Sequence, residues 1–250
     1  MAALTVAIVE KSFPALGAAS ARQVLGRLDF TLRPGETVVL TGPSGCGKTT
    51  LLNIVAGLDC RFEGRIEMPE GTRIGYVFQE PRLLPWRTVE DNLRLVLRGE
   101  EAEIARRIGE VLAEVGLADA HHVYASRLSL GMVRRVAIAR AFVVRPSLLL
   151  LDEPFVSLDE PTAARLRRLL LGLLATHRVT TLFVTHDLRE AIMLADRLLF
   201  LSHPPARIVA DVPVPLDRAA RTEDAAIEAF RVRLGELPAL LERGLAEPAP

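Results

Sequence analysis

The chain has 250 residues, half of them apolar, and carries 31 acidic and 31 basic residues. A chain of this length suits one large domain, or a domain with a subdomain and a tail, and its apolar content allows a sizeable core. The neutral charge balance gives no support for a broadly basic surface that binds nucleic acid or anionic membranes.

The two cysteines, Cys46 and Cys60, are too few for a disulfide framework or a cysteine-based zinc site. Free thiols in a reducing compartment are the simplest interpretation. The N-terminal segment lacks the basic stretch of a signal peptide. No apolar run reaches the roughly 18 residues that a membrane-spanning helix needs. We therefore expect a cytosolic protein that meets a membrane only through a partner.

Hydrophobic patterning predicts alternating strands and helices. In chain order, we expect strands at 4–13, 23–32 and 36–41, a helix at 48–58, a strand at 73–78, helices at 88–97, 100–115 and 131–144, a strand at 148–151, a helix that begins at Pro161, a strand at 179–184, a helix at 188–194, a strand at 198–201, and a helix at 222–241 interrupted by Pro238. This alternation predicts an α/β fold with a mostly parallel sheet covered on both faces.

The mostly helical segment from about residue 84 to 145 interrupts the alternation. We interpret it as a helical subdomain inserted into a domain of residues 1–215. After Pro215 the chain becomes charged and alanine-rich. Residues 216–250 are therefore predicted to form a C-terminal helical tail.

A glycine-rich motif, G-x-x-x-x-G-K-[ST], spans Gly42–Thr49 between a predicted strand and a predicted helix. Its glycines allow the backbone N–H groups to face phosphate oxygens, and the following helix presents its positive end. Lys48 is expected to reach the β- and γ-phosphates and Thr49 to ligate Mg²⁺. A chance glycine-rich turn is the alternative, which the strand and helix on either side argue against. The predicted ATP-binding residues of this loop are Gly42, Pro43, Ser44, Gly45, Cys46, Gly47, Lys48, Thr49 and Thr50.

Cys46 lies in this motif, close to the start of the predicted helix. A helix N-terminus favours an ionised thiol, so the sequence predicts a reactive Cys46 thiolate.

A second motif follows the apolar run at 148–151, which ends in Asp152 and Glu153. A buried strand that ends in acidic residues places carboxylates at the edge of the sheet where ligands bind. Asp152 suits a Mg²⁺ role, usually through water, and Glu153 suits a base that polarises an attacking water. Taken alone, such a strand end is more often simply solvated; the upstream phosphate loop makes the functional interpretation strong.

Further short motifs follow in a fixed order, and together they resemble the ATPase subunits of ATP-binding-cassette (ABC) transporters over roughly residues 4–212. Gln79 matches the glutamine of the Q-loop, Leu128–Met132 the family signature, and Ser157–Asp159 the D-loop. His186 matches the switch histidine, and Phe13 stands where relatives carry an adenine-stacking aromatic residue. Each match alone is weak, since a lone histidine, glutamine or phenylalanine is usually structural; their common order is specific.

The resemblance implies a P-loop NTPase cassette that hydrolyses ATP with Mg²⁺, with an N-terminal antiparallel β portion, a mostly parallel core sheet and the inserted helical subdomain. It implies catalytic roles for Glu153, His186 and Gln79. It further implies that the metal is held by Thr49, Gln79 and Asp152.

The resemblance also implies a homodimer of cassettes that face each other head to tail. Ser129 and Gly131 then act across the interface on the partner's γ-phosphate, where they offer hydrogen-bond donors and the positive end of a helix. Asp159 is the aspartate of the D-loop. Loss of the γ-phosphate on hydrolysis loosens such a dimer.

One residue of the signature departs from the family pattern, because Leu130 replaces the first of two glycines. Leucine resists positive φ and adds bulk near a phosphate, which affects the expected hydrolysis rate more than ATP binding. The alternative is that this position tolerates a side chain that points away from the nucleotide. Val133 and Arg134 also stand where many relatives carry Arg-Gln.

The segment Phe78–Asn92 resembles the importers of nitrate, sulfonates, taurine and related small solutes, as does His203–Val209. This branch implies an integral-membrane permease as partner, a periplasmic or extracellular solute-binding protein acting indirectly, and a peripheral position on the cytoplasmic face of the membrane. No nucleic acid is expected. Trp86 either lines a groove for a permease helix or caps the core.

Two other functions remain open from the sequence. One is a soluble cassette ATPase of DNA repair or translation, against which the single cassette and the neutral charge argue. The other is a weakly hydrolysing, structural cassette, which Leu130 allows and which Lys48, Glu153 and His186 oppose.

Overall fold

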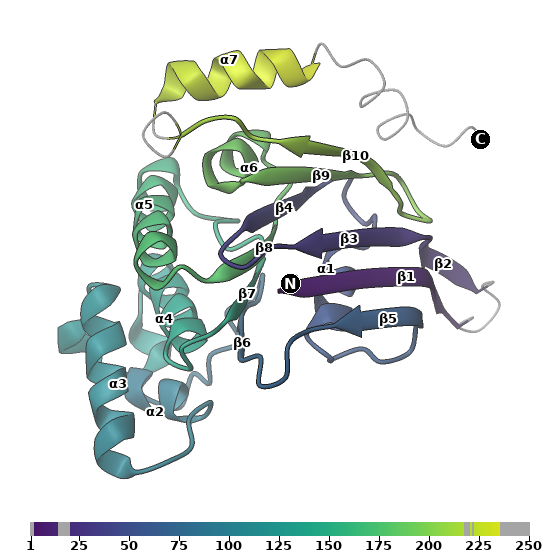
Figure 1. The fold of residues 1–250 in the computed structure, drawn as a ribbon. Helices are drawn as coiled ribbons and strands as arrows, with labels where there is room; N and C mark the ends of the chain where they lie inside the picture. Colours follow the sequence, from purple (N-terminus) through teal and green to yellow (C-terminus); the bar gives the residue numbers. More distant parts are fainter. Residues whose placement is uncertain (1–2, 15–20, 218–220, 222, 236–250) are drawn as a thin grey trace. The chain divides into compact units, whose positions relative to one another are not determined.

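The computed structural model describes residues 3–14, 21–217, 221 and 223–235, and they form two compact units. The first unit comprises residues from 1–70 and 180–250, and the second comprises residues 71–179. The elements of both units are labelled in Figure 1.

The first unit contains an antiparallel sheet built around β1 (Leu4–Phe13). This strand pairs antiparallel with β2 (Arg22–Leu25), β3 (Leu28–Leu32) and β5 (Glu63–Glu67). A single strand at 23–32 was predicted, which is wrong. The chain leaves the ladder at Gly26, whose amide donates to the carbonyl of Ala206 at 2.9 Å.

The first unit also contains parallel strands, as expected from the sequence. β4 (Thr37–Thr41) lies between β8 (Thr180–Val184) and β9 (Arg197–Leu201) and is parallel to both. An edge strand, β10 (Ile208–Pro213), pairs antiparallel with β9. Every residue of β4 and β8 is buried, which explains why neither strand contains a charged residue.

The described residues of this unit form the helices α1 (Lys48–Val55) after β4, α6 (Leu188–Leu194) after β8, and α7 (Asp224–Gly235). The last packs on α6 and buries an apolar stripe of Ile227, Phe230 and Leu234 (Figure 1). An ion pair between Arg189 and Asp224 joins the same two helices. α7 falls within the helix predicted at 222–241; residue 222 and residues 236–241 lie outside the described residues.

The second unit contains two parallel strands, β6 (Ile74–Val77) and β7 (Leu148–Asp152). Its helices are α2 (Val89–Arg94), α3 (Glu101–Glu114), α4 (Leu130–Phe142) and α5 (Glu160–His177), with short 3-10 turns at Ala118–Ala120 and Ala125–Arg127. α4 packs on β6 and contacts the three other helices. The segment 84–145, predicted to be a helical insertion, lies within this unit.

Three helices of the second unit begin at residues whose side chains cap the first turn. Thr88 forms a reciprocal capping box with Asp91 at the start of α2. Ser129 caps α4 and Asp159 caps α5, where Pro161 occupies the first turn as the sequence predicted. Among the described residues of both units, no helix combines the length and apolar character needed to cross a membrane.

Candidate functional site

The glycine-rich loop connects the buried strand β4 to α1 in the first unit. Gly47 precedes the helix with φ +107°, and a Cβ there would lie 2.6 Å from the side chain of Leu25. Both conditions require glycine. The helix has no side-chain cap and no acidic residue in its first turn. Its first amides and its positive end are therefore available for an anion.

Lys48 lies within this loop and is only 6% exposed. Its amine donates to the carbonyls of Gly42 and Pro43, both at 2.9 Å. Within the described ranges, no carboxylate forms an ion pair with it. A buried cation whose hydrogen-bond partners are neutral carbonyls is well suited to receive a phosphate.

The predicted thiolate at Cys46 is wrong. Its side chain is fully buried, and burial raises the pKa of the Cys46 thiol despite the opposing charge of Lys48. The Lys48 amine lies 4.0 Å from the sulfur. Desolvation of the charged form therefore outweighs the favourable position near a helix N-terminus.

Phe13 and His186 belong to the same unit as the phosphate loop. Phe13 is the last residue of β1 and pairs with Arg22 of β2. Two later residues of β2, Val24 and Leu25, lie against Gly47 of the phosphate loop. His186 directly follows β8, the parallel neighbour of β4, so it lies at the strand edge from which the phosphate loop emerges.

The turn that carries His186 is held on both sides. The Asp187 amide donates to the Thr185 hydroxyl at 3.0 Å, and this hydroxyl donates to Glu190 at 2.9 Å. The Asp187 carboxylate accepts from the amides of Arg189 and Glu190 and so caps α6. His186 is exposed between these anchored residues.

The acidic motif lies at the end of β7 in the second unit. Asp152 is buried, and its charge adds to the effect of burial in raising the pKa of Tyr76. Glu153 follows with φ +43°, a left-handed conformation that costs a non-glycine residue about 1–3 kcal/mol and often marks functional positions. Gln79 lies two residues beyond Val77, which pairs with Leu151, so the three polar residues share one strand edge.

Arg134 of α4 connects this edge to the turn that follows it. Its guanidinium donates to the carbonyl of Gln79 and, at 3.0 Å, to the carbonyl of Val156. Burial lowers the pKa of Arg134, and its Nε has no hydrogen-bond partner among the described residues. In the sequence, Arg134 is notable only because many relatives carry glutamine at this position. Its contacts could not be predicted, because the two carbonyls belong to loops that are distant from Arg134 in the sequence.

The signature residues form the start of α4. Ser129 is the N-cap and its hydroxyl accepts from the Met132 amide at 3.3 Å. Gly131 lies so close to α5 that a Cβ would be 3.0 Å from Thr162. Asp159 caps α5 through the Thr162 amide, and hydrogen bonds from the Thr162 side chain and then from this amide lower the pKa of the Asp159 carboxylate.

An open pocket of about 530 Å³ lies beside these residues in the second unit. The starts of α4 and α5 line it, together with the turn after α3, and its polar lining includes Ser129, Arg135, Ser157 and Asp159. The structure thus groups Ser129, Gly131 and Asp159 around one pocket. It groups Phe13, residues 42–50 and His186 in the other unit.

Comparisons with known proteins identify the family of the chain. The ABC transporter family matches residues 25–156, more than half of the chain. An aliphatic sulfonates import ATP-binding protein of Pseudomonas savastanoi pv. phaseolicola is 47% identical over 194 residues, which cover 77% of this chain and 80% of that protein. The protein of the same name from Bacillus subtilis is 37% identical over 238 residues, covering 93% and 92%.

Solved structures give the same result for the fold. A bacterial ABC transporter cassette solved as a dimer has a TM-score of 0.73 and 28% identity, and the match covers 86% of this chain and all of that one. A post-hydrolysis state of the same cassette, bound to ADP and Pi, matches equally well. The predicted P-loop cassette fold is confirmed, and this chain belongs to the ABC transporter family as an ATP-binding cassette.

Proposed function

We propose that this chain binds and hydrolyses ATP to power the import of a small solute through a membrane permease. The observation that carries the proposal is the geometry of the phosphate loop. The buried Lys48 amine donates to the carbonyls of Gly42 and Pro43 in this loop, and the N-terminus of α1, which directly follows the loop, has no side-chain cap. The relatives named as aliphatic sulfonate import proteins indicate a sulfonate or a similar small anion, such as nitrate or taurine, as the solute.

The proposed catalytic residues are those predicted from the motifs. Glu153 polarises the attacking water, while His186 and Gln79 orient the γ-phosphate and that water. Thr49, Gln79 and Asp152 supply the hydroxyl, amide and carboxylate oxygens that Mg²⁺ prefers, so this donor set fits the metal. Mg²⁺ supplies positive charge to the phosphates as they separate.

The proposed assembly is a homodimer of cassettes. Ser129 and Gly131 at the start of α4, with Asp159 of the D-loop, would meet the nucleotide held by the partner. The pocket beside these residues supports this role, because it opens onto the first turn of α4. The solved dimer of a related cassette supports the same arrangement.

The proposed permease contact lies around Trp86. The alternative that Trp86 caps the core is wrong, since the side chain is 70% exposed. Leu95, Val96 and Tyr124 of the same unit are also exposed. Large apolar and aromatic side chains that remain exposed are typical of a binding surface. We place the chain on the cytoplasmic face of the membrane, with the solute-binding protein engaging the permease rather than this subunit.

A soluble cassette of DNA repair or translation is not favoured by the relatives found. Co-purification from detergent-solubilised membranes distinguishes the two functions: the importer subunit travels with a multi-span permease, whereas a soluble cassette does not. Uptake of a sulfonate into vesicles that contain the whole transporter then tests the solute.

Replacement of Lys48 by alanine tests the phosphate loop. We expect Lys48→Ala to lose nucleotide binding or hydrolysis, because the phosphates lose their main cationic partner. Arg27→Ala is the matched control, since Arg27 is an exposed basic residue whose ion-pair partner is Asp29, two residues away. Steady-state ATPase activity and equilibrium ATP binding are measured for both. Full activity in Lys48→Ala would overturn the proposed function.

A further inference from the structure

Lys11 is an unusual residue of this chain. Of the 31 basic residues, only Lys11 and Lys48 are lysines, and all others are arginines. Lys48 belongs to the phosphate loop, but the proposed function gives no role to Lys11. Its side chain is 1% exposed and is among the largest fully buried side chains of the protein. A buried ammonium group is stable only where its hydration is replaced by hydrogen bonds and opposite charge.

The surroundings of Lys11 supply these contacts. Its Nζ donates to Asp59 Oδ1 at 2.8 Å and to the Arg61 carbonyl at 2.7 Å, and it lies 4.6 Å from the ring centroid of Phe13. Burial acts to raise the pKa of Asp59, but hydrogen bonds from Lys11 and from the Arg61 amide lower it overall. The ammonium group thus joins a carboxylate, a carbonyl and an aromatic ring.

The backbone of β1 explains how a lysine takes this place. Leu4, Val6 and Ile8 alternate into the core, which by simple alternation would turn residue 11 outward. The pairing of β1 with β5 is irregular between Ile8 and Glu10. Such an irregularity changes the face of the sheet to which the following side chains point. Lys11 consequently points inward. The pairing of β1 with β2 is irregular again between Lys11 and Ser12, and the Phe13 ring lies over the Lys11 ammonium.

Asp59 connects this cluster to the phosphate loop. It lies in the turn after α1, where the amides of Leu58 and Asp59 donate to the carbonyl of Asn53. α1 is the helix that begins at Lys48. The Lys11–Asp59 pair therefore joins the strand that carries Phe13 to the helix that carries the phosphate-binding residues.

We propose that Lys11 is a positioning residue that fixes the Phe13 ring relative to the phosphate loop, so that a purine base stacks on the ring while its triphosphate occupies the loop. This inference rests on the proposed function, ATP binding, and on the role in adenine stacking that the sequence predicts for Phe13. The ring stays 37% exposed and so retains surface on which a base stacks. Lys11 itself is buried beneath the surface and acts through Phe13 without touching the nucleotide.

If Lys11 acts through Phe13, it affects binding of the base but not binding of the phosphates. Two ligands, one with a base and one without, therefore test the proposal. Binding of ATP and of inorganic triphosphate is measured for the full-length wild type, Lys11→Met, Phe13→Ala and the double variant. Phe13→Ala should weaken ATP binding roughly ten- to a hundredfold, as expected for loss of a base-stacking ring. Lys11→Met should weaken it roughly three- to tenfold, as expected for loss of a partly buried cation–π contact.

Binding of triphosphate should stay unchanged in all three variants. The double variant should bind ATP as Phe13→Ala does, because Lys11 acts only through the ring. Arg65→Met, an exposed residue of the same sheet, is the matched control and should change neither affinity.

The outcomes separate the two levels of the proposal. If Phe13→Ala leaves ATP binding unchanged, the base-stacking role of Phe13 fails. If Phe13→Ala weakens ATP binding but Lys11→Met does not, only the role of Lys11 fails. Equal weakening of ATP and triphosphate by Lys11→Met would show a general structural effect and would also overturn the inference.

If Lys11→Met does not fold, NMR spectroscopy of the wild-type protein tests the role of Lys11 instead. Selective labelling of lysine with ¹³C gives side-chain NMR signals from just two residues, and Lys48→Ala identifies which signal belongs to Lys11. ATP should shift both signals, since a stacked base alters the field around the Phe13 ring. Triphosphate should shift the Lys48 signal alone. A Lys11 signal that does not respond to ATP, or responds equally to both ligands, would contradict the inference.

Discussion

Leu130 is the residue at which the chain departs most clearly from its family. The structure makes it the first residue of α4, directly after the cap Ser129, and its φ is not among the positive values found in the described residues. The backbone therefore does not need glycine here. The side chain is 47% exposed beside the pocket, so its bulk, and not backbone strain, is the property that can affect function.

We predict that Leu130→Gly raises the maximal ATPase rate of the assembled transporter and changes ATP affinity of the isolated subunit little. A leucine in the first turn of α4 holds approaching surfaces apart, and a misplacement of about 1 Å costs on the order of 10²-fold in rate. Leu130→Ala is the decisive companion, because it removes the same bulk but keeps a side chain. Both variants should gain rate when measured in the same permease complex. If neither gains, Leu130 is harmless or compensated.

Sequence analysis could predict those site residues that belong to short, continuous motifs. Lys48, Glu153 and Ser129 each stand in a local motif whose strand or helix context is visible in the sequence. The environment of Cys46 and the contacts of Arg134 were not predictable. Burial of a thiol, or a guanidinium between two carbonyls, depends on chain segments far away in sequence.

At the scale of elements, the buried strands were the most predictable. β4, β7 and β8 are rich in leucine, valine and other apolar residues, because every one of their residues is buried. β5 was missed because its sequence, Glu-Gly-Arg-Ile-Glu, is charged and mostly exposed, and only pairing with β1 makes it a strand. The interruption between β2 and β3 was missed for a similar reason, since Gly26 turns to pair with a distant carbonyl.

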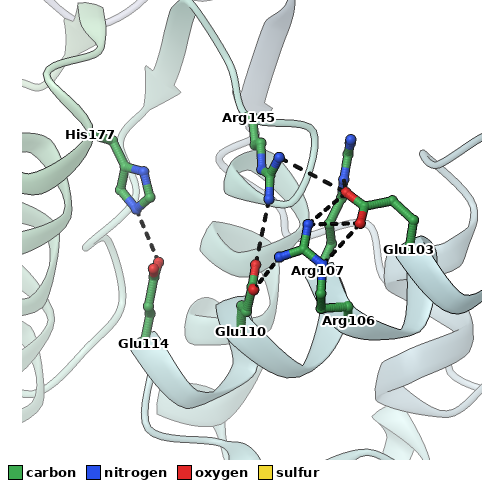
Figure 2. Close-up of polar contacts among 7 residues, drawn as sticks. All are labelled: Glu103, Arg106, Arg107, Glu110, Glu114, Arg145 and His177. Carbon is green, nitrogen blue, oxygen red and sulfur yellow. Dashed lines mark hydrogen bonds and ion pairs between the residues drawn. The ribbon is translucent and has the colours of Figure 1, made fainter.

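A charge cluster ties α3 to its surroundings in the second unit (Figure 2). Glu103 accepts from Arg106 and Arg107 of the same helix and lies 3.9 Å from Arg145 in the loop before β7. Arg145 also pairs with Glu110 at 3.5 Å. Farther along, Glu114 of α3 meets His177 at the end of α5 at 3.0 Å. Side chains on one helix thus contact two later segments.

We predict a pH-dependent loss of stability at Glu103. Hydrogen bonds from Arg107 and then Arg106 lower the pKa of Glu103 from 4.5 to about 2. A lowered pKa stabilises the folded state above the ordinary value of 4.5, and this contribution disappears as the pH falls through 2. The unfolding free energies of wild type and Glu103→Gln should therefore differ most above pH 5 and converge as the pH falls.

Urea denaturation from pH 6 to pH 3 measures this difference. Glu103 is only partly buried, so the difference should also shrink in about 1 M salt, which screens surface charges. A difference that stays constant down to pH 3, or survives high salt, would show that the substitution acts through packing and not through charge.

At the scale of the whole molecule, the proposed catalytic residues are divided between the two units. Lys48 and His186 belong to the first, whereas Gln79, Asp152 and Glu153 belong to the second. The sequence shows the order of these motifs, but it does not show that residues 180–250 return to the unit of the phosphate loop. That return follows from the pairing of β8 and β9 with β4, which is a contact over a long chain distance.

Glu153→Gln tests the proposed cycle at this scale. The substitution keeps shape and hydrogen-bonding capacity but removes the carboxylate that polarises water. Hydrolysis should slow roughly 10²–10⁴-fold, as for loss of a general base, while ATP binding remains. Because the γ-phosphate is then retained, ATP should hold two copies together. Gel filtration in Mg-ATP should show a dimer for Glu153→Gln where the wild type returns to the monomer.

Two further variants separate catalysis from a general charge effect. Glu67→Gln removes an exposed carboxylate on the antiparallel sheet and should behave as the wild type in both assays. Adding Lys48→Ala to Glu153→Gln should abolish the dimer, because ATP no longer binds. The permease contributes to assembly in the transporter, so the same variants are compared in the permease complex by ATPase rate and by retention of labelled ATP. A Glu153→Gln protein that hydrolyses ATP at the wild-type rate there would remove Glu153 from the mechanism.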